Sequence, residues 1–451
     1  MRIHALLPSL LLLAAPLVAQ NGSIAVRAGK LITNDGTVIE NGTVVVQDGR
    51  ITAVGGADLE LPFDVLLREY PDGVLFPGYC IAHNEGRQGV DQSNENIPVA
   101  PFLDVKDSID PVHLYYEEEL RGGTVAIGVI PGNDCVFGGR GRVVAPHGMT
   151  VEQMTLAEDM GVKVAIGAKR GWSRSAQLAE LREAVDKLGH QLRQLGQKLV
   201  DDGARREDLK SVGEEEDPEG DDGDGLDSAG GAVRYGEDFP GKALISEEDL
   251  DDTQLGLLRI LNGEERTWLW CPEATDVSHG ISWAKQHGLL ETSVFVVTAP
   301  AWKAAAMLKE AGRPVVLLGG LWQIERDPVT WEEQKTFAPK AFWDAGVQVA
   351  IVTEEGRLGP DRPGYQAAVC VREGMPRQAA LAAVTTAAAE AWGLGDRIGK
   401  LALGFDGSFT LLSGDPLDSQ AKVLEVWVRG QSVYQRDNDE RLQRLLDGED
   451  K

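Results

Sequence analysis

The residues from Val74 to Glu85 are the stretch of this sequence whose types and spacing could most directly support chemistry. An apolar run, interrupted by Pro77-Gly78, ends in His83, Asn84 and Glu85. Because side chains alternate along a strand, His83 and Glu85 lie two apart on the same face. An imidazole and a carboxylate delivered together at the mouth of a barrel can begin a metal site. The remaining elements determine whether that site is completed.

Apolar, β-rich runs alternate with helical patterns over the middle of the chain and predict an α/β fold. Eight candidate strands span 74–82, 124–130, 141–145, 162–167, 267–271, 293–298, 314–318 and 347–352. Helices are predicted over 277–288, 301–311, 333–345 and 378–392. Eight buried strands that alternate with helices predict a (β/α)8 TIM barrel over residues 74–399.

The two ends of the chain predict a second, smaller β unit. Ile24 to Tyr70 carries short β-rich runs, and Asp48-Gly49 between two of these runs indicates a hairpin. Gly399 to Leu412 and Val423 to Tyr434 return to the same pattern. Since neither end can bury a core alone, we expect residues 20–73 and 400–436 to form one small β-sandwich domain.

One long insertion, residues 172–240, interrupts the barrel pattern. Ser175 to Asp202 repeats leucines at helical spacing and predicts an amphipathic helix. Glu214 to Asp238 then loses its apolar residues and fills with Asp, Glu and Gly, a composition that favours disorder. This acidic stretch could collect cations or bind a partner, or it could be a solvated loop.

The charge of the chain argues against one class of partner. The 451 residues carry a formal net charge of −27, and residues 201–252 alone hold 20 acidic and 5 basic residues. The acidity is therefore mostly local, and it argues against nucleic-acid binding, which needs a basic surface. The four cysteines, which show no metal-type spacing, are expected to be buried free thiols: Cys80, Cys135, Cys271 and Cys370.

Residues 1–19 are typical of a secretory signal peptide. Arg2 supplies positive charge, Ala5 to Val18 forms an apolar core, and Ala19 is a plausible cleavage residue. The apolar core holds 14 residues, whereas a membrane-spanning helix needs about 20. We expect an exported protein, periplasmic or secreted, without a membrane span; the alternative is a buried N-terminal helix.

Short motifs spread over nearly the whole chain carry a resemblance to a known family. They lie at 29–32, 44–55, 74–78, 122–126, 130–132, 138–141, 383–388, 393–399 and 414–417. In these segments, such as Val74-Leu75-Phe76-Pro77-Gly78, the chain resembles the metal-dependent amidohydrolases, and among them the imidazolonepropionase-like branch. The resemblance implies a metal-dependent hydrolase of C–N bonds that acts on a small, cyclic or linear amide.

The resemblance also implies where an active site would lie. Members of the family use a His-x-His pair on the first barrel strand, one histidine on each of strands five and six, and an aspartate after strand eight. Many members add a carboxylated lysine near strand four. In this sequence the corresponding positions fall, in order, on His83, Glu85, Trp270, Thr298 and Glu354, with Lys169 as the candidate lysine.

One of the four family histidines therefore remains, which leaves three hypotheses. The barrel could have lost its metal site and bind a small amide-type ligand between Trp270, Thr298 and Tyr79. Alternatively, the chain could be an active hydrolase in which His83, Glu85 and Lys169 hold a divalent metal and Glu354 is the catalytic carboxylate. Such an oxygen-rich site suits Mg²⁺, Ca²⁺ or Mn²⁺ better than Zn²⁺. In the third hypothesis the protein acts through its acidic insertion.

Overall fold

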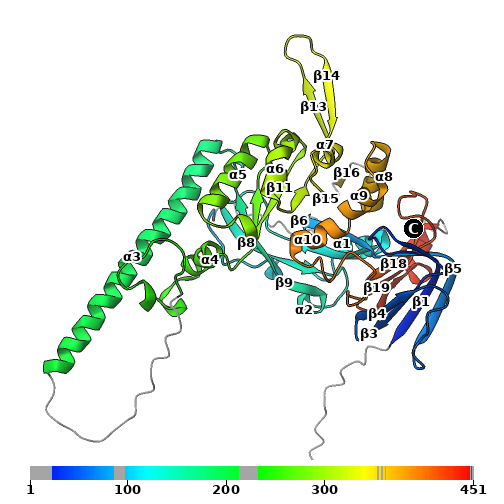
Figure 1. Ribbon diagram of the computed structural model, residues 1–451, viewed down its shortest axis with the longest axis horizontal. Coiled ribbons are helices and arrows are strands. Elements are labelled where there is room, and N and C mark those ends of the chain that lie inside the picture. The colour runs from blue at the N-terminus through cyan, green and yellow to red at the C-terminus, as the bar shows by residue number, and fades with distance from the viewer. Residues whose placement is uncertain are drawn as a thin grey trace, which may run out of the picture.

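The computed structural model describes residues 23–85, 97–212, 232–352, 355–356, 359–360, 362–446 and 448. Two β-sheets organise these residues, one in the middle of the chain and one built from both ends (Figure 1). The predicted signal peptide at residues 1–19 lies outside the described residues. No helix among the described residues is long and apolar enough to cross a membrane.

The central sheet has eight strands and curves into a nearly closed barrel. Its strands, in sheet order, are β6 (Tyr79–Asn84), β7 (Thr124–Val129), β8 (Phe137–Val144), β9 (Thr155–Ala165), β10 (Thr267–Trp270), β11 (Ser293–Val297), β12 (Val315–Leu317) and β15 (Val349–Ile351). Within the described chain the hydrogen-bonded order ends at β15 and β6, which still lie close together. Each of the eight strands predicted from the sequence has a counterpart here, and the barrel-like fold is confirmed.

The third barrel strand departs from the all-parallel arrangement that was predicted. β8 pairs antiparallel with both β7 and β9. Parallel neighbours need a crossover of about a dozen residues or more, whereas only residues 130–136 connect β7 to β8. The short connection leaves no room for a crossover helix, so the strict (β/α)8 pattern is wrong at this strand.

Helices connect the other strands and surround the barrel (Figure 1). They are α1 (Leu114–Gly122), α2 (Val151–Met154), α3 (Arg174–Val212), α4 (Asp252–Leu261), α5 (Ala274–Gln286), α6 (Ala305–Ala311), α7 (Ala338–Asp344), α8 (Pro363–Arg372), α9 (Arg377–Ala383), α10 (Thr386–Trp392) and α11 (Glu440–Leu446). Short 3-10 helices are η1 (Val105–Asp107), η2 (Lys242–Leu244), η3 (Glu247–Asp249), η4 (Leu290–Thr292), η5 (Ala299–Ala304) and η6 (Arg436–Asn438).

Two predicted helices differ from the structure. The helix predicted over residues 333–345 begins only at Ala338, because Glu333–Phe337 is strand β14, which pairs with β13 (Trp322–Arg326) in a hairpin. The helix predicted over residues 378–392 is divided into α9 and α10 at Val384 and Thr385. A second, very short hairpin joins β16 (Glu355–Gly356) and β17 (Gly359–Pro360).

Both ends of the chain contribute to the other sheet, as predicted. Its strands are β1 (Ile24–Ile32), β2 (Val38–Glu40), β3 (Thr43–Gln47), β4 (Arg50–Gly55), β5 (Leu66–Phe76), β18 (Phe409–Leu412), β19 (Val423–Val428) and β20 (Gln431–Gln435). Asp48 and Gly49 have positive φ values of 49° and 76° in the turn between β3 and β4, so the predicted hairpin is confirmed. All eight strands are hydrogen-bonded in one sheet, and the division into two facing sheets of a sandwich stays a prediction.

The inserted helix is present and longer than predicted. α3 covers Arg174–Val212 and extends beyond the rest of the molecule (Figure 1). Three of its leucines, Leu181, Leu188 and Leu192, are buried at the end that packs near α4. Most of the acidic stretch that follows, residues 213–231, lies outside the described residues. The four cysteines are buried free thiols, as predicted.

Candidate functional site

Four polar side chains form a hydrogen-bonded network at the carboxyl end of β6. Nζ of Lys163 lies 2.6 Å from Nε2 of His83 and donates to Oδ1 of Asn133 at 2.7 Å. Nδ2 of Asn133 in turn donates to Oε2 of Glu85 at 2.7 Å. His83 is on β6, Glu85 follows that strand, Asn133 lies in the loop after β7, and Lys163 is on β9, the fourth strand of the barrel. We call these four residues the His83–Lys163 network.

The network reaches from the barrel interior to the surface. Lys163 and His83 are buried, whereas Glu85 is exposed. Gly138 on β8 leaves room for the lysine, because a Cβ at Gly138 would lie 3.1 Å from Cβ of Lys163. The indole of Trp268, with its ring centroid 6.3 Å from that of His83, fills the barrel beside the network. Lys163 is therefore enclosed, and its amine reaches only the polar atoms built around it.

Burial determines the protonation of the two basic groups. Desolvation, followed by repulsion from Lys163, holds the pKa of His83 well below its ordinary value, so this imidazole is neutral at pH 7. Desolvation also lowers the pKa of Lys163 to about 8, while attraction to Glu85 acts in the opposite direction. At pH 7 the lysine is still mostly an ammonium and donates to Nε2 of His83. The imidazole proton must then lie on Nδ1.

The predicted first-strand pair, His83 and Glu85, is thus connected through Lys163 and Asn133. Sequence reasoning missed Lys163 and assigned the lysine role to Lys169. The structure places Nζ of Lys169 4.1 Å from the ring centroid of Trp172, which is a cation–π contact. The signal for Lys163 was present in the sequence Val162-Lys163-Val164-Ala165, a single cation inside an apolar strand.

The remaining predicted residues have different surroundings. Trp270 ends β10 and is half-buried, and its carbonyl accepts from the backbone N–H groups of Ile166 and Gly167. Thr298 follows β11, and its hydroxyl donates to the carbonyl of Pro272 at 2.7 Å. Glu354 lies outside the described residues.

Tyr79 lies at the start of β6, at the opposite end of the strand from Asn84 and the network. Its hydroxyl donates to the carbonyl of Pro416 at 2.8 Å, and burial raises its pKa. Tyr79 lines a cavity together with Leu412 and Pro416, near the sheet that both ends of the chain form. The structure therefore does not bring Tyr79 together with Trp270 and Thr298.

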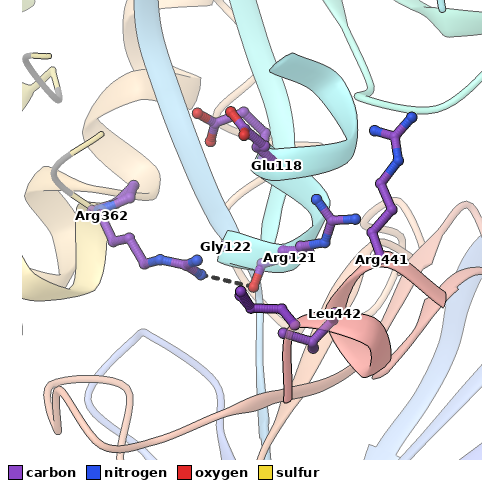
Figure 2. A pocket seen from close by; sticks show the side chains of 9 residues that line it. Glu118, Arg121, Gly122, Arg362, Arg441 and Leu442 are labelled. Carbon is purple, nitrogen blue, oxygen red and sulfur yellow. Dashed lines mark hydrogen bonds between the residues drawn. The ribbon is translucent and has the colours of Figure 1, made fainter. Parts of the chain in front are cut away.

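A neighbouring cavity of about 320 Å³ lies between α1, α8 and α11 (Figure 2), and no residue of the network lines it. Its arginines form ion pairs and hydrogen bonds with other residues of the protein. Arg121 pairs with Glu117 and Asp439, and Nη1 of Arg362 donates to the carbonyl of Arg121 at 2.8 Å. We therefore interpret this cavity as a gap in the packing between the barrel and the C-terminal helix.

The donor set of the network does not fit a divalent metal ion. A metal ion would need the Nε2 lone pair of His83, which faces the Lys163 ammonium. The strand-five and strand-six positions hold an indole, which does not ligate, and a hydroxyl that is bonded to a carbonyl. Among the described residues, no three His, Cys, Asp or Glu side chains are grouped so as to hold a metal ion.

Comparison with known proteins finds matches to amidohydrolases over parts of the chain. Residues 345–434 match the sequence model of the amidohydrolase family. A segment of 97 residues, 22% of this chain and 10% of the relative, is 35% identical to the amidohydrolase tasK of Hapsidospora irregularis. The match thus covers about a tenth of that protein.

Solved structures of low sequence identity share the fold. An amidohydrolase from Thermotoga maritima MSB8 matches with a TM-score of 0.68 and 21% identity, over 92% of this chain and 100% of that one. An adenosine deaminase from Xanthomonas campestris with bound zinc matches with a TM-score of 0.50 and 18% identity, over 94% and 96% of the two chains. The resemblance predicted from the sequence is confirmed.

Proposed function

We propose that this chain, which has the amidohydrolase fold and matches the amidohydrolase family over residues 345–434, is a binding protein that no longer hydrolyses amides. The observation that carries the proposal is the 2.6 Å contact between Nζ of Lys163 and Nε2 of His83. An ammonium group stands where the remaining family histidine would offer its lone pair to a metal ion. The cation and the metal ion exclude one another by charge and by volume.

The residues around the barrel mouth support binding of a small amide-type molecule. Trp270 is half-buried and offers an aromatic face. Asn133 and Glu85, at the outer end of the network, offer amide and carboxylate groups that can pair with an amide of the ligand. Lys163, which contacts Nε2 of His83, donates to Oδ1 of Asn133 and so holds this side chain in place. In this arrangement the ligand is recognised, and no residue of the network is positioned as an activated nucleophile.

Hydrolysis assays test this proposal. The purified protein, supplemented in turn with Mg²⁺, Mn²⁺ and Zn²⁺, is offered simple amides, lactams and dipeptides. We expect turnover no greater than that of the His83→Ala variant, which serves as the matched control. Metal-stimulated turnover that His83→Ala abolishes would overturn the proposal.

A second candidate is an active, metal-dependent hydrolase, and one observation favours it. Lys163 lies on the fourth barrel strand and faces His83, where the family resemblance places a carboxylated lysine. Its pKa of about 8 leaves a fraction of neutral amine at pH 7. The ammonium first loses one proton, and the neutral amine then forms an N–C bond to CO2 as one C=O π bond opens. Loss of a second proton leaves a carbamate anion in place of the cation. Lys163 and Glu85 would then both supply oxygen ligands beside His83.

Bicarbonate distinguishes the two candidates. If the second is correct, incubation with ¹³C-labelled bicarbonate and Mg²⁺, which is diamagnetic, gives a carbamate signal in ¹³C NMR and stoichiometric metal, both of which disappear in Lys163→Met. If the first is correct, the carbamate signal and the metal are absent from both proteins. Lys169→Met is the control for the neighbouring lysine.

We also propose that the protein is exported. The support is the sequence of residues 1–19, with Arg2, the apolar core from Ala5 to Val18, and Ala19. Cell fractionation with N-terminal sequencing tests it. We expect a mature chain that begins at Gln20 outside the cytoplasm, whereas a chain that keeps Met1 in the cytoplasmic fraction would contradict the proposal.

A further inference from the structure

The hairpin formed by β13 and β14 projects from the barrel (Figure 1). Trp322 is 41% exposed, Ile324 54%, Val329 83% and Trp331 70%. Trp322 and Ile324 lie on β13, and Val329 and Trp331 lie in the turn between β13 and β14. A two-stranded sheet is only marginally stable alone in water. Exposed apolar groups gathered on a projecting element are typical of an interaction surface.

The outer edge of β13 carries unpaired backbone groups. Hydrogen-bonded partners alternate along an antiparallel ladder. Backbone N–H groups of Asp327 and Ala338 donate to the carbonyls of Glu332 and Leu321, both at 2.9 Å. The residues between these positions that face β14 are therefore Gln323 and Glu325.

The backbone N–H and C=O groups of Trp322, Ile324 and Arg326 point away from β14. No hydrogen bond to these groups is found within the described chain. The free edge thus presents three donors and three acceptors in a row.

This edge is complementary to itself. If a second copy pairs antiparallel with Ile324 opposite Ile324, then Trp322 of each copy lies opposite Arg326 of the other. Each opposed pair exchanges two backbone hydrogen bonds, so the free groups of both edges are satisfied. The guanidinium meets an indole in a cation–π contact, as Arg326 already does with Trp331 at 5.9 Å within one hairpin.

The other strand of the hairpin does not offer an equivalent edge. Lys335 is the cross-strand partner of Ile324 and occupies the corresponding central position of β14. Pairing two β14 edges about this position would place two lysines opposite one another, which is destabilising. A lysine at the centre of an edge strand discourages strand addition.

The direction of the hairpin suits a dimer. Two hairpins that pair antiparallel point their bases in opposite directions, so the two barrels stand on opposite sides of the contact. The tip of each hairpin, with Val329 and Trp331, then reaches the base of the other hairpin, where Trp322 packs against Phe337 with ring centroids 4.9 Å apart. The exposed tip residues thereby gain apolar contacts.

We propose that β13 is a dimerisation edge, through which two copies of this chain join their hairpins into one four-stranded antiparallel sheet with Ile324 on the two-fold axis. The contact is isologous, as expected for the commonest soluble oligomers. It makes use of backbone groups and apolar side chains that the single chain leaves exposed.

A crosslinking experiment tests the register. Opposed residues in a hydrogen-bonded antiparallel pair have Cα atoms about 5.5 Å apart, within the range that a disulfide spans. Because the four native cysteines are buried, Ile324→Cys adds a single exposed thiol. We expect Ile324→Cys to form a disulfide-linked dimer under mild oxidation, and Lys335→Cys, its cross-strand neighbour on the outer strand of the proposed sheet, to form no disulfide link. Equal crosslinking of both variants, or none, would overturn the register.

A pair of proline variants tests the contact itself. The N–H groups of Ile324 and Lys335 both point away from the hairpin ladder, so proline at either position leaves the β13–β14 pairing intact. In analytical ultracentrifugation, Ile324→Pro should raise the dimer dissociation constant roughly thirtyfold, because two intermolecular hydrogen bonds are lost. Lys335→Pro should leave it unchanged. A wild-type protein that is monomeric at all concentrations, or equal weakening by both variants, would contradict the proposal.

Discussion

At the level of single residues, the cation that lies beside His83 determines whether this imidazole can bind a metal ion. An ammonium group and a divalent metal ion compete for the same lone pair of this imidazole. Lys163 is held there by the barrel strand that carries it, by the space that Gly138 leaves, and by the side-chain amide oxygen of Asn133. The network therefore gives the buried side chains of His83 and Lys163 polar partners without an ion.

Removing the lysine charge should change the titration of His83. In Lys163→Met the repulsion that lowers the pKa of His83 is lost, while the desolvation remains. We therefore expect the pKa of His83 to rise but to stay below its ordinary value. Imidazole resonances followed by NMR against pH measure this change. A pKa of His83 that does not move would show that the ammonium is not beside the ring.

The space beside the lysine can be tested separately. In Gly138→Ala the new Cβ would lie 3.1 Å from Cβ of Lys163 and 3.1 Å from Sγ of Cys135. We expect a loss of unfolding free energy of about 1–3 kcal/mol, as for other overpacked sites. Gly189→Ala on α3 is the control, because that position is open and helical, and it should be stabilising by up to about 1 kcal/mol. Chemical denaturation measures both; equal effects would contradict the packing account.

Sequence reasoning identified part of this site. His83 and Glu85 follow from the strand pattern, because alternation fixes which side chains share a face. Lys163 was missed because no role can be assigned to a cation in an apolar strand until its partner across the barrel is known. His83 is 80 positions away in the sequence, and no local pattern predicts that contact.

At the level of single helices and strands, features that depend on a few neighbouring residues were predicted correctly from the sequence. Asp48-Gly49 marked its hairpin because a tight turn needs positive φ at both positions. By contrast, the direction of β8 depends on the length of its connection, which the strand pattern does not show. Glu333–Phe337 was predicted to be helical, but it pairs with β13, because a cross-strand partner overrode its weak helical signal.

One pair of charged residues connects distant elements and gives a pH-dependent prediction. Asp439 accepts from Nη2 of Arg121 on α1 at 3.0 Å and from the backbone N–H of Leu442 on α11 at 3.0 Å. The bond with Arg121 is the main reason why the pKa of Asp439 is lowered from 3.8 to about 2. A depressed carboxyl pKa stabilises the fold above the unfolded value, and that stability is lost as the pH falls from about 4 towards 2.

The Asp439→Asn variant tests this connection. At pH 6 it should be less stable than the wild type by about 2 kcal/mol, and the difference should shrink to near zero at pH 2. Glu117→Gln removes the more exposed partner of Arg121 and should cost at most about 1 kcal/mol. Urea denaturation at both pH values measures the differences. A deficit that is the same at pH 6 and pH 2 would contradict the assignment.

At the scale of the whole molecule, the barrel-like fold and the contribution of both chain ends to one sheet were predictable. The repeated alternation of apolar runs with helical patterns predicts a barrel, and this prediction does not depend on the residues of the candidate site. The path of α3 and the projecting hairpin were not predictable, because each leaves the packed body and is fixed by few contacts. Trp270 and Thr298 lie at the ends of β10 and β11, where the family resemblance implies ligand histidines.

The metal content of the purified protein distinguishes a barrel that holds only the Lys163 ammonium beside His83 from one that holds a metal ion there. The protein is produced with excess Zn²⁺ and Mn²⁺, dialysed, and analysed by elemental mass spectrometry beside His83→Ala and Glu354→Ala. The account predicts that wild type and both variants carry the same trace of metal, far below one ion per chain. Stoichiometric metal in the wild type that is lost in either variant would contradict it, and would show that the barrel still holds a working metal site.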